Sequence, residues 1–200
     1  MPRLARYLTH PQVHIDATVD VGSWSLNETG AARVAALVQN LGVLRDTRHV
    51  FSSEETKALE TATPLAAALD LPVQVRPGMH ENDRSATGFL PPDEFERVAD
   101  RFFAEPLTSV RGWETAADAQ RRILKATLSC LAEAGEGDVL FVGHGAVGTL
   151  LFCALAGHGI DRRFDQGPNG GGCWFDFDID DPVPRHGWRP MESLSAKGGA

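Results

Sequence analysis

Short apolar runs alternate with longer segments of helical period along most of the chain. The apolar runs lie at 4–8, 49–51, 72–75 and 138–143, and runs of this length bounded by turn residues predict buried β-strands. Between and after them, apolar side chains recur at helical spacing over about 27–41, 52–69, 91–106, 115–135 and 145–156. Strands that alternate with helices predict an α/β domain, a three-layer α/β/α sandwich with a mostly parallel sheet.

Local signals place the starts of several helices. Asn27 is a predicted N-cap, and Ser52 with Ser53 is predicted to open the second helix. Thr115 followed by Asp118 forms a capping-box-like start of the long fourth helix.

The C-terminal quarter departs from this pattern. Residues 174–179 alternate Trp-Phe-Asp-Phe-Asp-Ile, which predicts a half-buried strand that is antiparallel or lies at the sheet edge. Asp176 and Asp178 share one face of that strand, and we expect this face to be solvated. The sequence from Pro182 is rich in proline, glycine and serine. We therefore expect a single domain over 1–181 and a poorly ordered tail over 182–200.

Composition narrows the class of protein. A hydrophobic content of 42% supports a substantial core, and a net charge of −8 argues against nucleic acid or an anionic membrane as a partner. Three cysteines without paired spacing favour a reducing compartment. The sequence contains neither a signal-peptide pattern nor an apolar run long enough to span a membrane, so we expect a cytoplasmic protein.

Each predicted strand of the parallel set is followed by residues with reactive or charged side chains, in chain order His10, Ser53 with Lys57, Glu81 and His144. Parallel strands end at one edge of a sheet, which is where ligands bind in open α/β folds. Glycines flank His144, which precedes a helix whose N-terminus favours anions. The sequence therefore predicts one anion site at this edge.

Two imidazoles, an ammonium group and a carboxyl group suit phosphoryl transfer. A histidine can attack phosphorus and form a covalent intermediate, and cations balance the charge on the transferring oxygens. A carboxylic acid can protonate the leaving oxygen and then assist the attack of water. This chemistry needs no metal and no cofactor.

Several segments resemble motifs of the histidine phosphatase superfamily, in its phosphoglycerate mutase-like branch, over about residues 4–156. They are Ser-Ser-Glu-Glu-Thr-Lys-Ala-Leu-Glu-Thr-Ala at 52–62, Gly-His-Gly at 143–145, Asn-Glu-Thr-Gly at 27–30 and Gly-Trp-Glu-Thr at 112–115. The resemblance implies a phosphorylated nucleophile at His10, a second phosphate-contacting histidine at His144 and a proton donor at Glu81. It also implies a substrate-binding set, which is Lys57, Thr9, Ser53 and Arg84.

The sequence departs from the family pattern at two positions. Thr-His-Pro stands at 9–11 where the family has Arg-His-Gly, and Lys57 replaces the second arginine of the family. Arginine binds phosphate through two parallel hydrogen bonds, whereas lysine is a point charge. We therefore expect a less cationic pocket, in which Arg84, or otherwise Arg6 on the first strand, restores charge; Arg84 is favoured because it lies near Glu81. The alternative for Arg84 is a surface pair with Asp83.

These observations favour a metal-independent phosphatase that acts on a phosphorylated small molecule or a phosphoprotein. A non-catalytic protein that binds a phosphorylated ligand is the main alternative, and a phosphomutase would use the same phosphohistidine. A dinucleotide enzyme is a further alternative, since residues 143–148 fit G-x-G-x-x-G. That fingerprint requires an acidic residue about 20 residues further on, at the end of the next strand, and this chain does not place one there.

Overall fold

The computed structural model describes residues 3–168 and 170–196. Within them one sheet has the strand order β3-β2-β4-β1-β5-β6. Its first four members are parallel, and β5 runs antiparallel to β1 and to β6. The strands are β1 (Leu4–Thr9), β2 (Thr47–Ser52), β3 (Val73–Val75), β4 (Asp138–Gly143), β5 (Cys173–Asp178) and β6 (Arg189–Pro190). The predicted mostly parallel sheet is confirmed.

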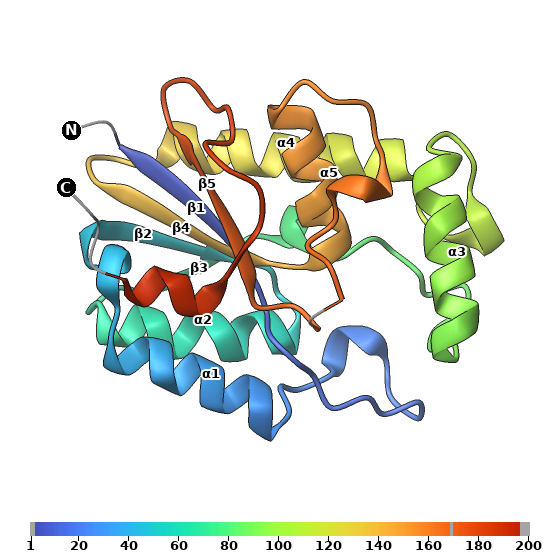
Figure 1. The fold of residues 1–200 in the computed structure, drawn as a ribbon, viewed down its shortest axis with the longest axis horizontal. Coiled ribbons are helices and arrows are strands. Elements are labelled where there is room, and N and C mark those ends of the chain that lie inside the picture. The colour runs from blue at the N-terminus through green and yellow to red at the C-terminus, as the bar shows by residue number, and fades with distance from the viewer. Residues whose placement is uncertain (1–2, 169, 197–200) are drawn as a thin grey trace.

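Helices cover both faces of this sheet (Figure 1). Buried strand residues such as Leu8 and Val142 pack with the first two helices on one face, whereas Tyr7 and Phe141 pack with the later helices on the other. The helices are α1 (Glu28–Gln39), α2 (Thr56–Ala68), α3 (Pro92–Ala104), α4 (Ala116–Glu133) and α5 (Gly145–Leu155). The molecule is therefore a three-layer α/β/α sandwich, as the sequence predicts.

Two of the predicted helix starts are confirmed and one is wrong. Asn27 accepts a hydrogen bond from the backbone N–H of Gly30 at 2.9 Å and caps α1. Thr115 caps α4 in the same way. Ser53 does not open α2, which begins at Thr56 with Glu55 as its N-cap residue. The Ser53 N–H instead bonds to the Val142 carbonyl at 3.1 Å, so Ser53 continues the pairing of β2 with β4.

The strand β5 is more deeply buried than its alternating pattern predicts. Cys173 to Phe177 are all buried, and Asp176, expected on a solvated face, is 6% exposed. The segment after Pro182 causes this difference, because Arg185 and His186 lie 3.4 and 3.2 Å from the Asp176 carboxylate.

The predicted tail has defined contacts over its described part. Residues 182–196 include β6 and the 3-10 helix η6 (Met191–Ser195), and Met191 and Leu194 are fully buried beside α1 and α2. Residues 197–200 of the predicted tail lie outside the described residues.

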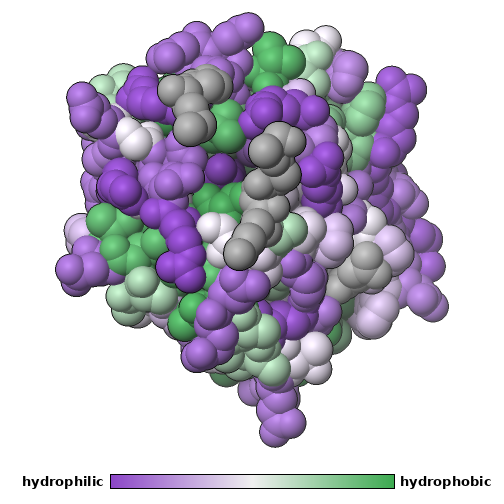
Figure 2. All heavy atoms as spheres, turned by 60° about the vertical axis from the view of Figure 1, so that its left-hand side comes forward, coloured by the Kyte–Doolittle hydropathy of each residue, from purple (hydrophilic) through white to green (hydrophobic). Residues whose placement is uncertain are grey.

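Hydrophilic side chains cover most of the face shown in Figure 2, and hydrophobic side chains form only small groups on it. The three cysteines are buried and unpaired. Among the described residues, the helices are all too short or too polar to cross a lipid bilayer.

Candidate active site

The carboxyl edge of the parallel strands brings the two predicted histidines together. The His10 N–H bonds to the Gly143 carbonyl at 2.9 Å, which extends the pairing of β1 with β4 by one residue. His144 follows Gly143 directly and is the N-cap residue of α5. The ring centroids of His10 and His144 are 5.3 Å apart, so the two imidazoles share one site.

The hydrogen bonds and burial of His10 define a neutral imidazole whose Nε2 has no hydrogen-bond partner within the described part of the chain. Its Nδ1 lies 2.8 Å from the Pro11 carbonyl oxygen, and because a carbonyl only accepts, Nδ1 carries the proton and Nε2 bears the lone pair. Burial lowers the pKa of His10 to about 4, and the charge of Lys57 acts in the same direction. At neutral pH the ring therefore presents an uncharged nucleophilic nitrogen.

Tyr7 fixes the backbone of His144 from the neighbouring strand. Its hydroxyl donates to the His144 carbonyl at 3.2 Å and accepts from the His144 N–H at 3.1 Å. The His144 ring is fully buried. Burial, aided by the nearby charge of Lys57, holds the pKa of His144 well below its usual range.

The glycines around His144 make room for Tyr7. A Cβ atom on Gly143 would meet the Tyr7 hydroxyl, and one on Gly148 would lie 2.6 Å from Tyr7 Cε1. Two of the glycines that resemble a dinucleotide fingerprint therefore have a packing function within this fold.

Glu81 lies at the N-terminus of α5. Its Oε1 accepts from the N–H groups of Asn82 and Val147, both at 3.0 Å, and its Oε2 accepts from the Ala146 N–H at 3.2 Å. This carboxylate therefore satisfies free backbone donors of the first helical turn. The contact also anchors the loop that carries Glu81 to the helix that follows His144.

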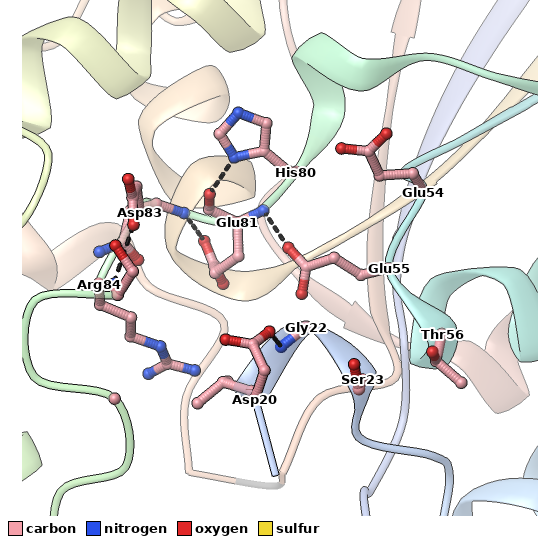
Figure 3. Close-up of a pocket in the computed structure, with 14 residues that line it drawn as sticks. Asp20, Gly22, Ser23, Glu54, Glu55, Thr56, His80, Glu81, Asp83 and Arg84 are labelled. Carbon is pink, nitrogen blue, oxygen red and sulfur yellow. Dashed lines mark hydrogen bonds between the residues drawn. The ribbon is translucent and has the colours of Figure 1, made fainter.

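Lys57 and His144 lie beside the carboxylate of Glu55, a residue to which sequence reasoning assigned no function. The buried Lys57 ammonium pairs with Glu55 Oε2 and donates to the Val21 carbonyl at 2.8 Å. Ser53 Oγ lies 2.8 Å from His144 Nε2 and accepts from the Glu55 N–H at 3.2 Å. Glu55 points at the loop that carries Glu81 (Figure 3).

Arg122 of α4 is a second residue that sequence reasoning missed. Its guanidinium donates to the carbonyls of Gly78, His80 and Glu81 at 2.9–3.2 Å and pairs with Glu114 at 2.6 Å. This one side chain therefore holds the loop before and through Glu81 against the helix layer. No local motif indicates this function, because its partners are backbone groups far away in sequence.

Two adjoining cavities open beside these residues. His10, Glu81 and Arg84 line a cavity of about 710 Å³ that extends to α3 and to residues 162–168 and 170–171. Glu55, Glu81 and Arg84 line a second cavity of about 490 Å³ (Figure 3). His10 is therefore reachable by a ligand, and it shares a cavity wall with a carboxylate and a guanidinium group.

Arg84 faces the site and does not pair with Asp83. Its guanidinium carbon lies 5.0 Å from the ring centroid of Phe95, and within the described residues it makes no side-chain hydrogen bond. Asp83 Oδ1 instead accepts from the Ser85 N–H at 2.9 Å. Arg84 thus keeps its donors for a ligand.

Like the buried Ser53, Lys57 and His144, Thr9 lines neither of these cavities. It is fully buried; its hydroxyl lies 2.6 Å from Gln166 Oε1 and accepts from the Cys173 N–H at 3.0 Å. Thr9 therefore links β1 to β5.

Asn82 is a further residue that sequence reasoning missed. Its side-chain Nδ2 is buried without a partner among the described residues, and Asn82 lines both cavities.

The fold and the paired histidines at the carboxyl edge define an α/β/α sandwich protein whose candidate site is built around two imidazoles. Residues 13–186 match the sequence model of the histidine phosphatase superfamily (branch 1), and the chain belongs to this superfamily. Residues 9–11, which carry the Thr-His-Pro motif, lie outside the matched range. Within the described residues, no group of three or more His, Cys, Asp or Glu side chains is arranged to hold a metal ion.

Solved structures share this fold at low sequence identity. A mycobacterial glucosyl-3-phosphoglycerate phosphatase is 20% identical, with a TM-score of 0.74 over 94% of this chain and 97% of that chain. YhfR of Bacillus stearothermophilus is 21% identical, with a TM-score of 0.76 over 92% of this chain and 95% of that chain. A phosphoserine phosphatase of Entamoeba histolytica, solved with 3-phosphoglyceric acid, is 16% identical, with a TM-score of 0.73 over 96% and 99%. No curated protein matches the sequence of this chain.

Proposed function

We propose that the protein is a phosphatase that hydrolyses a phosphate monoester through a phosphohistidine on His10. The observation that carries this proposal is the orientation of His10, whose Nδ1 is bound to the Pro11 carbonyl while the ring lines a cavity with Glu81 and Arg84. Membership of the superfamily supports a phosphatase. The phosphatases among the similar structures favour a phosphorylated small molecule as the substrate.

In the proposed reaction, His10 Nε2 attacks phosphorus and forms a P–N bond while the bond from phosphorus to the ester oxygen breaks. Glu81 enters this step as the carboxylic acid and gives its proton to the leaving oxygen, which leaves Glu81 as the carboxylate. Water then attacks the phosphohistidine, Glu81 takes a proton from that water, and the P–N bond breaks to release phosphate. Arg84 and Lys57 supply positive charge for the phosphoryl oxygens.

The same fold suits a protein that binds a phosphorylated ligand without turnover. One observation favours this second candidate. The Lys57 ammonium is already paired with Glu55, so less positive charge is free to balance the phosphoryl oxygens during transfer. The two candidates differ in whether His10 becomes phosphorylated. A mutase would also form phosphohistidine but would pass the group to a second hydroxyl.

The test is to incubate the purified protein with p-nitrophenyl phosphate and a panel of phosphorylated small molecules. Phosphate release is measured, and covalent phosphate is located by mass spectrometry under neutral conditions. We expect phosphate on His10 in the wild type. We expect His10→Ala to lose this adduct and at least ~100-fold of the rate of phosphate release.

His14→Ala is the matched control, because His14 lies four positions further along and is exposed. It should keep the adduct and the rate. Ligand binding by the wild type without an adduct or phosphate release, across the whole panel, would favour the binding protein. A transferred phosphoryl group on a second hydroxyl, in place of free phosphate, would favour the mutase.

A further inference from the structure

Glu55 places an internal carboxylate against two donors of the site and beside the His144 ring. Its Oε2 pairs with the Lys57 ammonium, and its Oε1 accepts from the Glu81 N–H at 2.7 Å and lies 3.5 Å from His144 Nε2. The side chain of Glu55 is only 13% exposed. Glu54, its neighbour in sequence, lies apart from this group in Figure 3 and is exposed.

These donors are suited to a phosphoryl group as well as to a carboxylate. Both groups are anions whose oxygens accept short hydrogen bonds from ammonium, imidazole and backbone N–H groups. We propose Lys57 as a phosphoryl contact, and the resemblance to the superfamily implies a phosphate contact at His144. An ionised Glu55 at this position therefore competes with a bound phosphoryl group for the same hydrogen bonds, and it also repels a phosphoryl group placed beside it.

We propose that Glu55 is an affinity-determining residue that acts as an internal competitor of the phosphoryl group. Binding of a phosphorylated ligand requires the Glu55 carboxylate to release Lys57 and the Glu81 N–H. Ligands that make additional contacts in the cavity beside His10 can displace it, whereas a bare phosphate ion is held weakly. This inference rests on the proposed function, because it takes the donors around Glu55 to be phosphoryl contacts.

The experiment compares anion binding by the wild type, Glu55→Gln and Glu54→Gln. Glutamine keeps the shape of the side chain and an acceptor for the Glu81 N–H but removes the negative charge. Inorganic phosphate and orthovanadate serve as probes, and titration calorimetry gives their dissociation constants. We expect Glu55→Gln to bind both anions at least ~10-fold more tightly than the wild type, and Glu54→Gln to bind them as the wild type does.

A second variant, Glu55→Ala, removes the carboxylate without leaving an amide. Circular dichroism and thermal unfolding show whether each variant is folded. Folded Glu55 variants that bind the anions no more tightly than the wild type would overturn this inference but leave the proposed function standing. Loss of the fold in both variants would have the same consequence. Failure of all the proteins to bind either anion, together with the absence of phosphohistidine in the wild type, would overturn the proposed function and this inference with it.

Discussion

Tyr7 connects β1 to the backbone of His144, and we expect its hydroxyl to contribute to stability. Tyr7→Phe keeps the ring that stacks on Phe175 at 5.6 Å but leaves the buried His144 N–H without its partner, while the His144 carbonyl keeps only the Gly148 N–H at 3.1 Å. Loss of these hydrogen bonds should lower the free energy of unfolding by about 1–3 kcal/mol. Urea unfolding monitored by circular dichroism measures this change, and an unchanged midpoint would mean that the hydroxyl contributes nothing.

Single residues of the site differ in how far the sequence reveals them. His10 and His144 were predictable as neighbours because each follows a strand of the parallel sheet, and topology alone brings such positions to one edge. Glu55 was not predictable as a site residue, because the function we propose for it depends on donors from Lys57 and from the Glu81 backbone. Thr9 has the residue type of a ligand contact, yet its hydroxyl is used by β5, which pairs with β1 from far along the chain.

At the scale of elements, the loop that carries Glu81 depends on α4 through Arg122. Arg122→Met removes the guanidinium and leaves the partly buried Glu114 carboxylate unpaired. We expect the free energy of unfolding to fall by about 2–4 kcal/mol, because charge-assisted hydrogen bonds to three carbonyls are lost. Hydrogen exchange over residues 78–84 should become faster, and phosphatase activity should fall as Glu81 loses its fixed position.

The neighbouring Arg121→Met is the control for this prediction. Arg121 is 74% exposed and, among the residues that the structure describes, pairs only with Asp118 on the same helix surface, so its loss should change stability by less than ~0.5 kcal/mol. Exchange rates over 78–84 that are the same in both variants would contradict the function assigned to Arg122.

Elements were predictable where their signals are local. Asn27 and Thr115 cap their helices through backbone groups within three residues, and both starts were predicted from sequence. The start of α2 was predicted wrongly, because the Ser53 N–H forms a hydrogen bond across the sheet and Ser53 does not cap the helix. The alternating pattern of β5 suggested a solvated face, but Asp176 is covered by Arg185 and His186, and periodicity carries no information about such a covering segment.

At the scale of the whole molecule, the site makes folding stability depend on pH. The pKa of His10 is about 4 in the folded protein because burial lowers it, whereas an unfolded histidine has a pKa of about 6.5. Between these values the unfolded chain binds more protons than the folded protein, so stability rises with pH through this window. The contribution of His10 is therefore complete above about pH 6.5 and is lost as the pH falls toward 4.

His10→Gln should remove this part of the pH dependence. Between pH 7 and 4 we expect the wild type to lose on the order of 2 kcal/mol more unfolding free energy than His10→Gln, after a discount for the solvent that reaches the ring. Urea unfolding at pH 7, 5.5 and 4 measures both proteins. His14→Gln, at an exposed position, should follow the wild type. Parallel pH profiles of the wild type and His10→Gln would show that His10 is not held neutral by burial, and this would remove the basis for an uncharged nucleophile at neutral pH.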